Sequence, residues 1–193
     1  MSVYQPTQQA ESTPDCTQSL YLCGGCFWGM EKALQNFYGV TATQVGYANG
    51  ETENPSYQEV CTGKTGHKEC VKVNYDPTKI SLETLLEVYF ICIHPEQHNA
   101  QGNDFGTQYQ EAVYVTKIDE LTRVNDYFTN ERKKHSLFFV ESDFLHSFYP
   151  AEEYHQQYLA KNPQGYCHIQ RKEMNAIQAL NQRLQGEKYA KNY

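Results

Sequence analysis

The chain lacks long apolar runs. Hydrophobic residues make up 39% of its 193 residues, mean hydropathy is −0.72, and no window approaches the ~20 apolar residues that a transmembrane helix needs. An excess of basic charge is also missing, since 16 Lys and Arg stand against 23 Asp and Glu, which gives a net charge of −7. The densest basic cluster is only residues 132–134. We therefore expect neither nucleic acid nor a membrane as a partner.

The N-terminus lacks the positively charged segment and the apolar run of a secretory signal. Residues 1–17 are instead rich in Gln, Thr, Ser and Pro, which is typical of a flexible tail. No repeat or linker divides residues 18–193, so we predict a single domain there. Seven is an odd number of cysteines, which favours free thiols over a set of disulfides and predicts a cytoplasmic protein.

Strands and helices interleave along the chain. Apolar alternation and short apolar runs predict strands over 19–23, 40–47, 71–75, 112–115 and 137–140. Apolar residues three and four apart predict helices over 30–37, 82–93, 118–128, 150–159 and 172–184, and residues 48–66 and 96–110 read as loops. Several successive strands have no helix between them, which favours an α+β fold. We expect a two-layer α/β sandwich, in which helices pack on a ferredoxin-like mixed sheet with long loops.

Cys26 has the neighbourhood of a reactive thiol. It lies in residues 24–29, Gly-Gly-Cys-Phe-Trp-Gly, between a predicted strand and a predicted helix. The free N–H groups and positive dipole of a helix N-terminus favour an anion, so we expect a lowered pKa and a nucleophilic thiolate. The alternative is a small buried hydrophobic residue. Phe27 and Trp28 could line an apolar pocket beside the thiol or could simply belong to the core.

Glu69 is an acidic residue with an apolar pattern around it. It shares its side of the predicted strand with Val71, Val73 and Tyr75, so its carboxyl group should point to the buried face. Burial raises the pKa of a carboxyl group and keeps its proton available as a general acid. The alternative is a solvated Glu at a strand end.

The string around Cys26 resembles the signature of the peptide methionine sulfoxide reductase A family. The resemblance runs from about Leu20 to Cys167. It includes residues 45–48 (Val-Gly-Tyr-Ala), 54–57 (Asn-Pro-Ser-Tyr), 60–63 (Val-Cys-Thr-Gly), 65–69 (Thr-Gly-His-Lys-Glu), 101–104 (Gln-Gly-Asn-Asp), 106–109 (Gly-Thr-Gln-Tyr) and 154–158 (Tyr-His-Gln-Gln-Tyr), in the family's order.

The resemblance implies an enzyme that reduces methionine-S-sulfoxide, free or in proteins, to methionine and so repairs oxidised proteins. Cys26 matches the nucleophile, which becomes a sulfenic acid, and Glu69 matches the acid. Cys167 matches the resolving cysteine, in a mobile C-terminal segment, and implies a Cys26–Cys167 disulfide. Thioredoxin, or dithiothreitol in vitro, would reduce this disulfide. No bound cofactor and a monomer are expected.

The resemblance also implies a substrate site. Tyr57 and Tyr109 match the two tyrosines that bond the sulfoxide oxygen, and Phe27 and Trp28 match the pocket for the S-methyl group. Asp104 matches a residue that orients the substrate, although in Gly-Asn-Asp it could equally be an Asx-turn residue.

Metal binding is the weaker alternative. Cys61, His67 and Cys70 lie close together in the sequence, and His94 and His98 are four residues apart. Structural zinc needs a closed set of four ligands, and a proline follows His94, so the two histidines are not in one helix. We expect no metal site. A peroxide-reducing thiol enzyme and a sulfoxide-binding module are the alternative functions.

The remaining cysteines are expected to be thiols without a role in turnover. Cys23 and Cys70 should be small buried residues, and Cys70 has the parity opposite to that of Glu69. Cys61 matches a family cysteine that turnover does not need, and Cys92 lies on a predicted helix. Cys16, in the tail, could take part in disulfide exchange.

Overall fold

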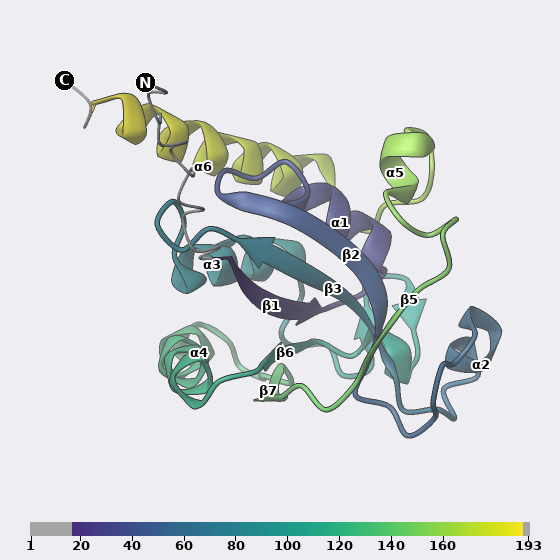
Figure 1. Ribbon diagram of the computed structural model, residues 1–193. Coiled ribbons are helices and arrows are strands. Elements are labelled where there is room, and N and C mark those ends of the chain that lie inside the picture. Colours follow the sequence, from purple (N-terminus) through teal and green to yellow (C-terminus); the bar gives the residue numbers. More distant parts are fainter. Residues whose placement is uncertain (1–16, 191–193) are drawn as a thin grey trace, which may run out of the picture.

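A six-stranded mixed sheet forms the centre of the protein (Figure 1). The computed structural model describes residues 17–190, so the expected tail over 1–17 falls almost entirely, and Cys16 entirely, outside the described residues. The strands are β1 (Gln18–Cys23), β2 (Val40–Ala48), β3 (Lys68–Tyr75), β6 (Ala112–Val115), β7 (Glu141–Phe144) and β8 (Phe148–Pro150). Their spatial order is β7-β6-β1-β3-β2-β8. Only β6 and β7 are parallel; the other neighbours are antiparallel.

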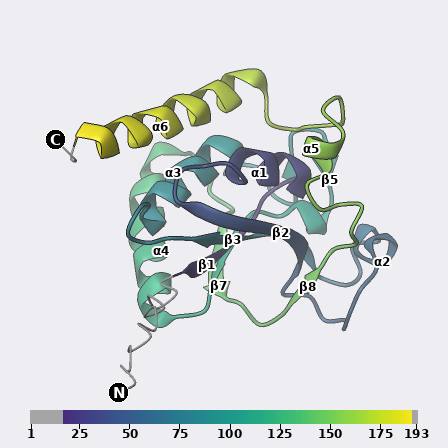
Figure 2. The same cartoon turned by 45° about the horizontal axis from the view of Figure 1, so that its top comes forward.

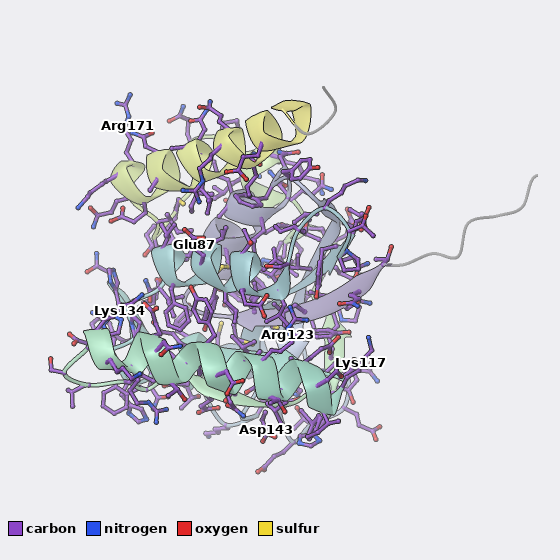
Figure 3. All side chains as sticks on the ribbon, turned by 90° about the vertical axis from the view of Figure 1, so that its left-hand side faces the viewer. Glu87, Lys117, Arg123, Lys134, Asp143 and Arg171 are labelled. Carbon is purple, nitrogen blue, oxygen red and sulfur yellow. The ribbon has the colours of Figure 1, made fainter. Side chains whose placement is uncertain are left out.

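Helices form the second layer. α1 (Phe27–Leu34) packs on β2 and β3, and α4 (Ile118–Glu131) packs on β6 and β7. α3 (Leu82–Cys92) contacts both of these helices, and α6 (Arg171–Ala190) packs on α3 from outside (Figure 2). Figure 3 shows α6, α3 and α4 as three tiers, with Arg123 on α4. Arg123 forms an ion pair of 2.8 Å with Glu83 of α3. The expected α+β fold with a mixed sheet is confirmed.

The sheet separates two apolar clusters because successive strand residues point to opposite faces. The helix-covered face holds the main core, which includes Leu20, Leu22, Val71 and Val73. The opposite face holds a smaller cluster, covered by Leu145 and Phe148, of Tyr21, Cys23, Ala48, Cys70, Ala112 and Tyr114. Cys23 and Cys70 are fully buried and face each other across β1 and β3, as small buried residues were expected to be. In the described part of the chain, no helix has the length and apolar character to cross a membrane.

Two expected loops contain short regular elements. Residues 48–66 include α2 (Tyr57–Cys61), which begins with a capping box: the Ser56 hydroxyl accepts from the Glu59 N–H, and the Glu59 carboxylate accepts from the Ser56 N–H. Residues 96–110 include the hairpin of β4 (Ala100–Gln101) and β5 (Asp104–Phe105), and the 3₁₀ turn η1 (Thr107–Tyr109). Capping by Ser56 explains how so short a helix can form within a polar loop.

The strand expected over 137–140 is wrong, because the strand of this region follows directly after these residues. β7 starts at Glu141, and a second 3₁₀ turn, η2 (Arg132–Lys134), lies before this segment. Phe138 instead packs against the rings of Phe90 and Phe128, and the Phe139 N–H donates to the Pro95 carbonyl at 2.8 Å. The aromatic contacts with the helix layer therefore replace strand pairing here.

The helix expected over 150–159 is also wrong. Phe148–Pro150 form β8, and α5 spans only Tyr158–Lys161. The Gln156 side chain accepts from the Val45 N–H at 3.0 Å and donates to the Val45 carbonyl at 2.9 Å, so it pairs with β2 as a strand backbone would. Gln157 has a left-handed φ of 52°, which interrupts any helix before Tyr158.

Candidate active site

Cys26 lies at the N-terminus of α1, as the sequence predicts. It is the N-cap residue, with φ −68° and ψ 122°, and Gly25 before it has a left-handed φ of 61°. The backbone N–H groups of Trp28 and Gly29 point toward its sulfur and lower its pKa. The glycine turn thus ends β1 and presents the thiol to the first turn of the helix.

The expected net lowering of the Cys26 pKa is wrong. Burial is the largest influence and raises the pKa well above its ordinary value, and the nearby Glu69 carboxyl raises it further. The two helix N–H groups offset only part of this rise. A thiol that is 7% exposed lacks the water that a thiolate needs, so Cys26 is protonated in this state.

Glu69 is buried on β3, with its carboxyl group on the helix-covered side as its parity predicts. It is 2% exposed, and its Oε2 accepts from the Phe27 N–H at 3.0 Å. Burial raises the pKa of Glu69 to about 8; the Phe27 N–H opposes the rise and the Asp104 charge adds to it. Glu69 is therefore mostly protonated at neutral pH and can donate a proton beside Cys26.

Tyr57 and Tyr109 come to the same place from α2 and η1. Burial raises the pKa of both hydroxyls above the ordinary value, and the charge of Glu69 is among the groups that add to this rise. Tyr109 is also within electrostatic reach of Cys26, and its carbonyl accepts from the Gly25 N–H at 3.2 Å. Both hydroxyls thus stay protonated and can donate hydrogen bonds.

Phe27 and Trp28 differ in how far they are buried. Phe27 is 2% exposed and belongs to the main core, where its ring centroid lies 6.0 Å from that of Tyr47. Trp28 is half-buried and stacks on Tyr158, with ring centroids 3.9 Å apart. Only Trp28 of the two presents part of its ring to solvent beside Cys26.

Asp104 is half-exposed at the start of β5. Its carboxylate accepts from the Tyr166 hydroxyl at 3.0 Å. Burial raises the pKa of Asp104, and the hydrogen bond from Tyr166 offsets part of that rise. Asp104 therefore ties the segment that carries Cys167 to the loop that carries Tyr109.

Cys167 lies against the first turn of α1. Its sulfur contacts the Ile169 carbonyl at 3.5 Å, and a Cβ placed on Gly29 would lie 3.3 Å from that sulfur. Gly29 is one residue short of a helical turn from Cys26, so the two cysteines belong to the same end of α1. The six cysteines within the described residues are all free.

Comparison with known proteins agrees with this arrangement. The family model described as "Peptide methionine sulfoxide reductase" matches residues 18–187. The chain belongs to the peptide methionine sulfoxide reductase family. It is accordingly an enzyme, an oxidoreductase.

Individual members of the peptide methionine sulfoxide reductase family resemble the chain over most of its length. "Peptide methionine sulfoxide reductase MsrA" of Alkaliphilus metalliredigens is 47% identical over 79% of this chain and 97% of its own. Methionine sulfoxide reductase A of Corynebacterium diphtheriae has a solved structure with a TM-score of 0.73 and 36% identity, over 79% of this chain and 78% of that one. The structure of Mxr1 from Saccharomyces cerevisiae in reduced form has a TM-score of 0.75 and 33% identity, over 83% of this chain and 93% of that one. Mxr1 has also been solved in complex with Trx2. That structure has a TM-score of 0.53 and 22% identity, over 78% of this chain and 91% of that one.

Sequence reasoning missed two residues that contact Tyr57, a site residue of this reductase. His155 is 1% exposed, accepts from the Trp28 indole N–H at 3.1 Å, and lies against the rings of Phe27 and Tyr57. Glu152 accepts from the Tyr47 hydroxyl at 2.7 Å and the Tyr57 N–H at 2.9 Å. The match of residues 154–158 to the family pattern contained His155, but nothing in the local sequence indicated which element it would contact.

Weighing the metal alternative as if the chain had no Cys-x-x-Cys pair is wrong for Cys23. Cys23 and Cys26 are three residues apart, as in the Cys-x-x-Cys motif of dithiol oxidoreductases. The structure places Cys23 in the cluster on the far face of the sheet, whereas Cys26 lies beside Glu69 on the helix-covered face. The two thiols therefore do not form a dithiol pair.

His67, one of the histidines considered for a metal, has other contacts. Both ring nitrogens of His67 are engaged in this reductase, one accepting from the Gly50 N–H at 3.0 Å and one 2.8 Å from the Thr52 carbonyl. Across residues 17–190, no three His, Cys, Asp or Glu side chains are grouped so that they could hold a metal ion.

Proposed function

We propose that the protein reduces methionine-S-sulfoxide, free or in proteins, to methionine, with Cys26 as nucleophile and Glu69 as acid. The observation that carries the proposal is the hydrogen bond of 3.0 Å from the Phe27 N–H to Glu69. It fixes a protonated carboxyl group to the residue that directly follows Cys26, so a sulfoxide sulfur in contact with Cys26 would place its oxygen near the acid. A buried thiol and a buried carboxyl group call for an explanation, and a role in catalysis supplies one.

The protonation states support a concerted reduction step. Cys26 and Glu69 both have raised pKa values, so the resting site holds two neutral acids rather than an ion pair. Glu69 gives its proton to the sulfoxide oxygen while the Cys26 sulfur attacks the sulfoxide sulfur. The Cys26 proton replaces the one that Glu69 has lost. The hydroxyl group then moves from the substrate sulfur to the Cys26 sulfur as the bond between the two sulfurs breaks. The products are methionine and a Cys26 sulfenic acid, which carries the oxygen.

Substrate orientation follows from the groups around Cys26. The Tyr57 and Tyr109 hydroxyls donate to the sulfoxide oxygen, and Asp104 orients the rest of the substrate. The half-exposed ring of Trp28 receives the methyl group, backed by Phe27 beneath it. A chiral sulfoxide cannot exchange its oxygen and methyl positions, so donors on one side and an apolar wall on the other select one epimer.

Resolution and reductant complete the cycle. Cys167 attacks the Cys26 sulfenic acid, which forms a disulfide and releases water. A dithiol protein of the thioredoxin type then reduces the disulfide, and dithiothreitol can replace it in vitro. The structure of Mxr1 in complex with Trx2 supports a protein partner of this kind.

Two variants test this proposal. Cys26→Ser should abolish reduction of the S epimer with dithiothreitol, because the serine oxygen cannot carry the oxygen as a sulfenic acid; residual turnover of that variant would refute the nucleophile. Cys167→Ser should still form one methionine per enzyme but should lose turnover with thioredoxin. Cys61→Ser, a cysteine of the same neighbourhood, serves as the control and should keep both activities. The R epimer and a peroxide, offered in parallel, should give no comparable turnover.

A further inference from the structure

His168 follows Cys167 and lies between two glycines that flank Cys26 in the sequence. A Cβ placed on Gly25 would lie 3.3 Å from His168 Nε2, and one placed on Gly29 would lie 2.9 Å from Nδ1. The second of these points is also 3.3 Å from the Cys167 sulfur. His168 Nδ1 and Cys167 Sγ therefore lie together on the first turn of α1, in space that a side chain at Gly29 would fill.

Both ring nitrogens of His168 are buried, and neither makes a hydrogen bond of good geometry among the described residues, although the Cys92 backbone lies close enough to favour the protonated ring. A neutral imidazole has one N–H donor and one acceptor nitrogen, and burying either without a partner is unfavourable. His67 shows the ordinary solution, because both of its nitrogens are engaged by loop backbone. Unpaired buried polar groups of this kind call for an explanation, and a role in chemistry is one of them.

The surroundings of His168 keep the ring neutral. Burial lowers the pKa of His168 to about 4; the backbone of Cys92 opposes this, and the charge of His94 adds to it. The titratable groups around Cys26 at this end of α1 are its own thiol, the carboxyl groups of Glu69 and Asp104, and the hydroxyl of Tyr109. Closer to His168 lie the Cys167 thiol and, at the start of α6, the carboxyl group of Glu173 beside Cys92. At neutral pH the imidazole is therefore unprotonated, and one of its ring nitrogens is a vacant proton acceptor.

We propose that His168 is the base of the resolving step, taking the proton of the Cys167 thiol while the Cys167 sulfur attacks the sulfenic acid on Cys26. The inference rests on the proposed function of Cys167. The S–S bond forms as the S–O bond of the sulfenic acid breaks, and the leaving hydroxide receives the proton from His168 and departs as water. The Cys167 thiol is oxidised and the Cys26 sulfenic acid is reduced, so no further oxidant or reductant is needed.

A base is needed because of what surrounds Cys167 in the reduced state. Its only hydrogen-bond contact within the described residues is the Ile169 carbonyl, an acceptor, which cannot stabilise a thiolate. The thiolate is the form that attacks, so a base that takes the proton of Cys167 during the attack speeds the step. A weakly basic imidazole holds the proton only during the attack and releases it to the much more basic hydroxide.

The experiment separates the two chemical steps as a function of pH. The full-length protein is mixed with one equivalent of a methionine-S-sulfoxide without reductant, between pH 5.5 and 8.5. Methionine is quantified, and the Cys26–Cys167 disulfide is followed by mass spectrometry after alkylation. The wild type, His168→Gln, His168→Asn and Cys167→Ser are compared. Glutamine and asparagine retain a polar side chain but cannot take up a proton.

We expect methionine formation in His168→Gln to stay within about twofold of the wild type. Disulfide formation should slow by about 10²-fold at pH 6–7, the lower end of what general base catalysis supplies. The wild-type rate of this step should vary little with pH, whereas the variant rate should rise about tenfold per pH unit, as it does when a thiolate must form unaided.

Three results would overturn the assignment: an unchanged disulfide rate, a slowing that is equal at every pH, which would indicate packing alone, or loss of methionine formation in both variants. Failure of the proposed function has a different signature. In that case the wild type would form no Cys26–Cys167 disulfide, or Cys167→Ser would turn over with thioredoxin as the wild type does.

Discussion

At the scale of single residues, the site depends on burial more than on the helix dipole. A helix N-terminus favours a thiolate by an amount typical of a dipole interaction, while removal of water disfavours it more strongly. Here burial is the larger influence on Cys26, and it acts in the same direction on Glu69. The result is a site that stores a proton on the acid and exposes no reactive thiolate before substrate binds.

Glu69→Gln should slow methionine formation in a single turnover by about 10²–10⁴-fold, the contribution of general acid catalysis. The wild-type rate should also fall as pH rises through about 8, because Glu69 then loses the proton that, in the proposed step, it gives to the sulfoxide oxygen. The variant has no such proton to lose, so its decline near this pH should vanish. Rapid-quench measurements of methionine at several pH values test both effects.

Glu111→Gln is the matched control for this variant. Glu111 is fully buried and also has a pKa raised to about 8 by burial, but its carboxylate accepts from the His94 N–H rather than from the turn after Cys26. Its removal should leave the rate and its pH dependence unchanged. Equal losses in the two variants would show that a buried carboxyl group matters only for folding.

At the scale of elements, two helices with the same kind of cap differ in what they position. Ser56 begins α2, whose first residue is Tyr57, and Ser81 begins α3, where its hydroxyl accepts from the Thr84 N–H at 3.1 Å. α3 lies in the helix layer, whereas α2 carries a proposed substrate donor. The cap of α2 therefore holds a group of the site as well as a helix end.

Ser56→Ala and Ser81→Ala should each lower the free energy of unfolding by about 1 kcal/mol, the usual effect of losing a serine N-cap. Only Ser56→Ala should also lower kcat/KM for the sulfoxide, by several fold, because Tyr57 loses its fixed position. Urea denaturation and steady-state assays with dithiothreitol measure the two quantities. A similar fall in kcat/KM for Ser81→Ala would remove the proposed link between α2 and the substrate.

The elements also show which features follow from local pattern. The Gly-Gly turn and the apolar spacing after it correctly place Cys26 at a helix start, and the parity of β3 correctly buries Glu69. Local pattern cannot show that side chains such as Gln156 pair with a distant strand, so the helix expected over 150–159 is wrong. The expectation of a lowered pKa for Cys26 is wrong for a similar reason, since the burial of this thiol depends on loops and on a C-terminal segment far away in sequence.

At the scale of the whole molecule, several acids are buried within the same protein. Glu69 and Glu111 both have a pKa raised to about 8, and burial also raises the pKa of Glu31. In the unfolded chain, these carboxyl groups would lose their protons near their ordinary pKa of 4.5. The native state therefore binds more protons than the unfolded state across the interval between about 4.5 and 8, which makes the stability of the protein dependent on pH.

Glu111→Gln isolates this effect from the chemistry of the site. A raised carboxyl pKa stabilises the native state fully below about pH 4.5, and that contribution is lost as pH rises toward about 8. The slope for one group is at most about 1.4 kcal/mol per pH unit. The free energy of unfolding of the wild type should thus fall relative to that of the variant from pH 5 to 8 and then run parallel to it. Urea denaturation at pH 5, 6.5, 8 and 9 measures the difference, and curves that stay parallel throughout would show that Glu111 is ionised in the folded protein.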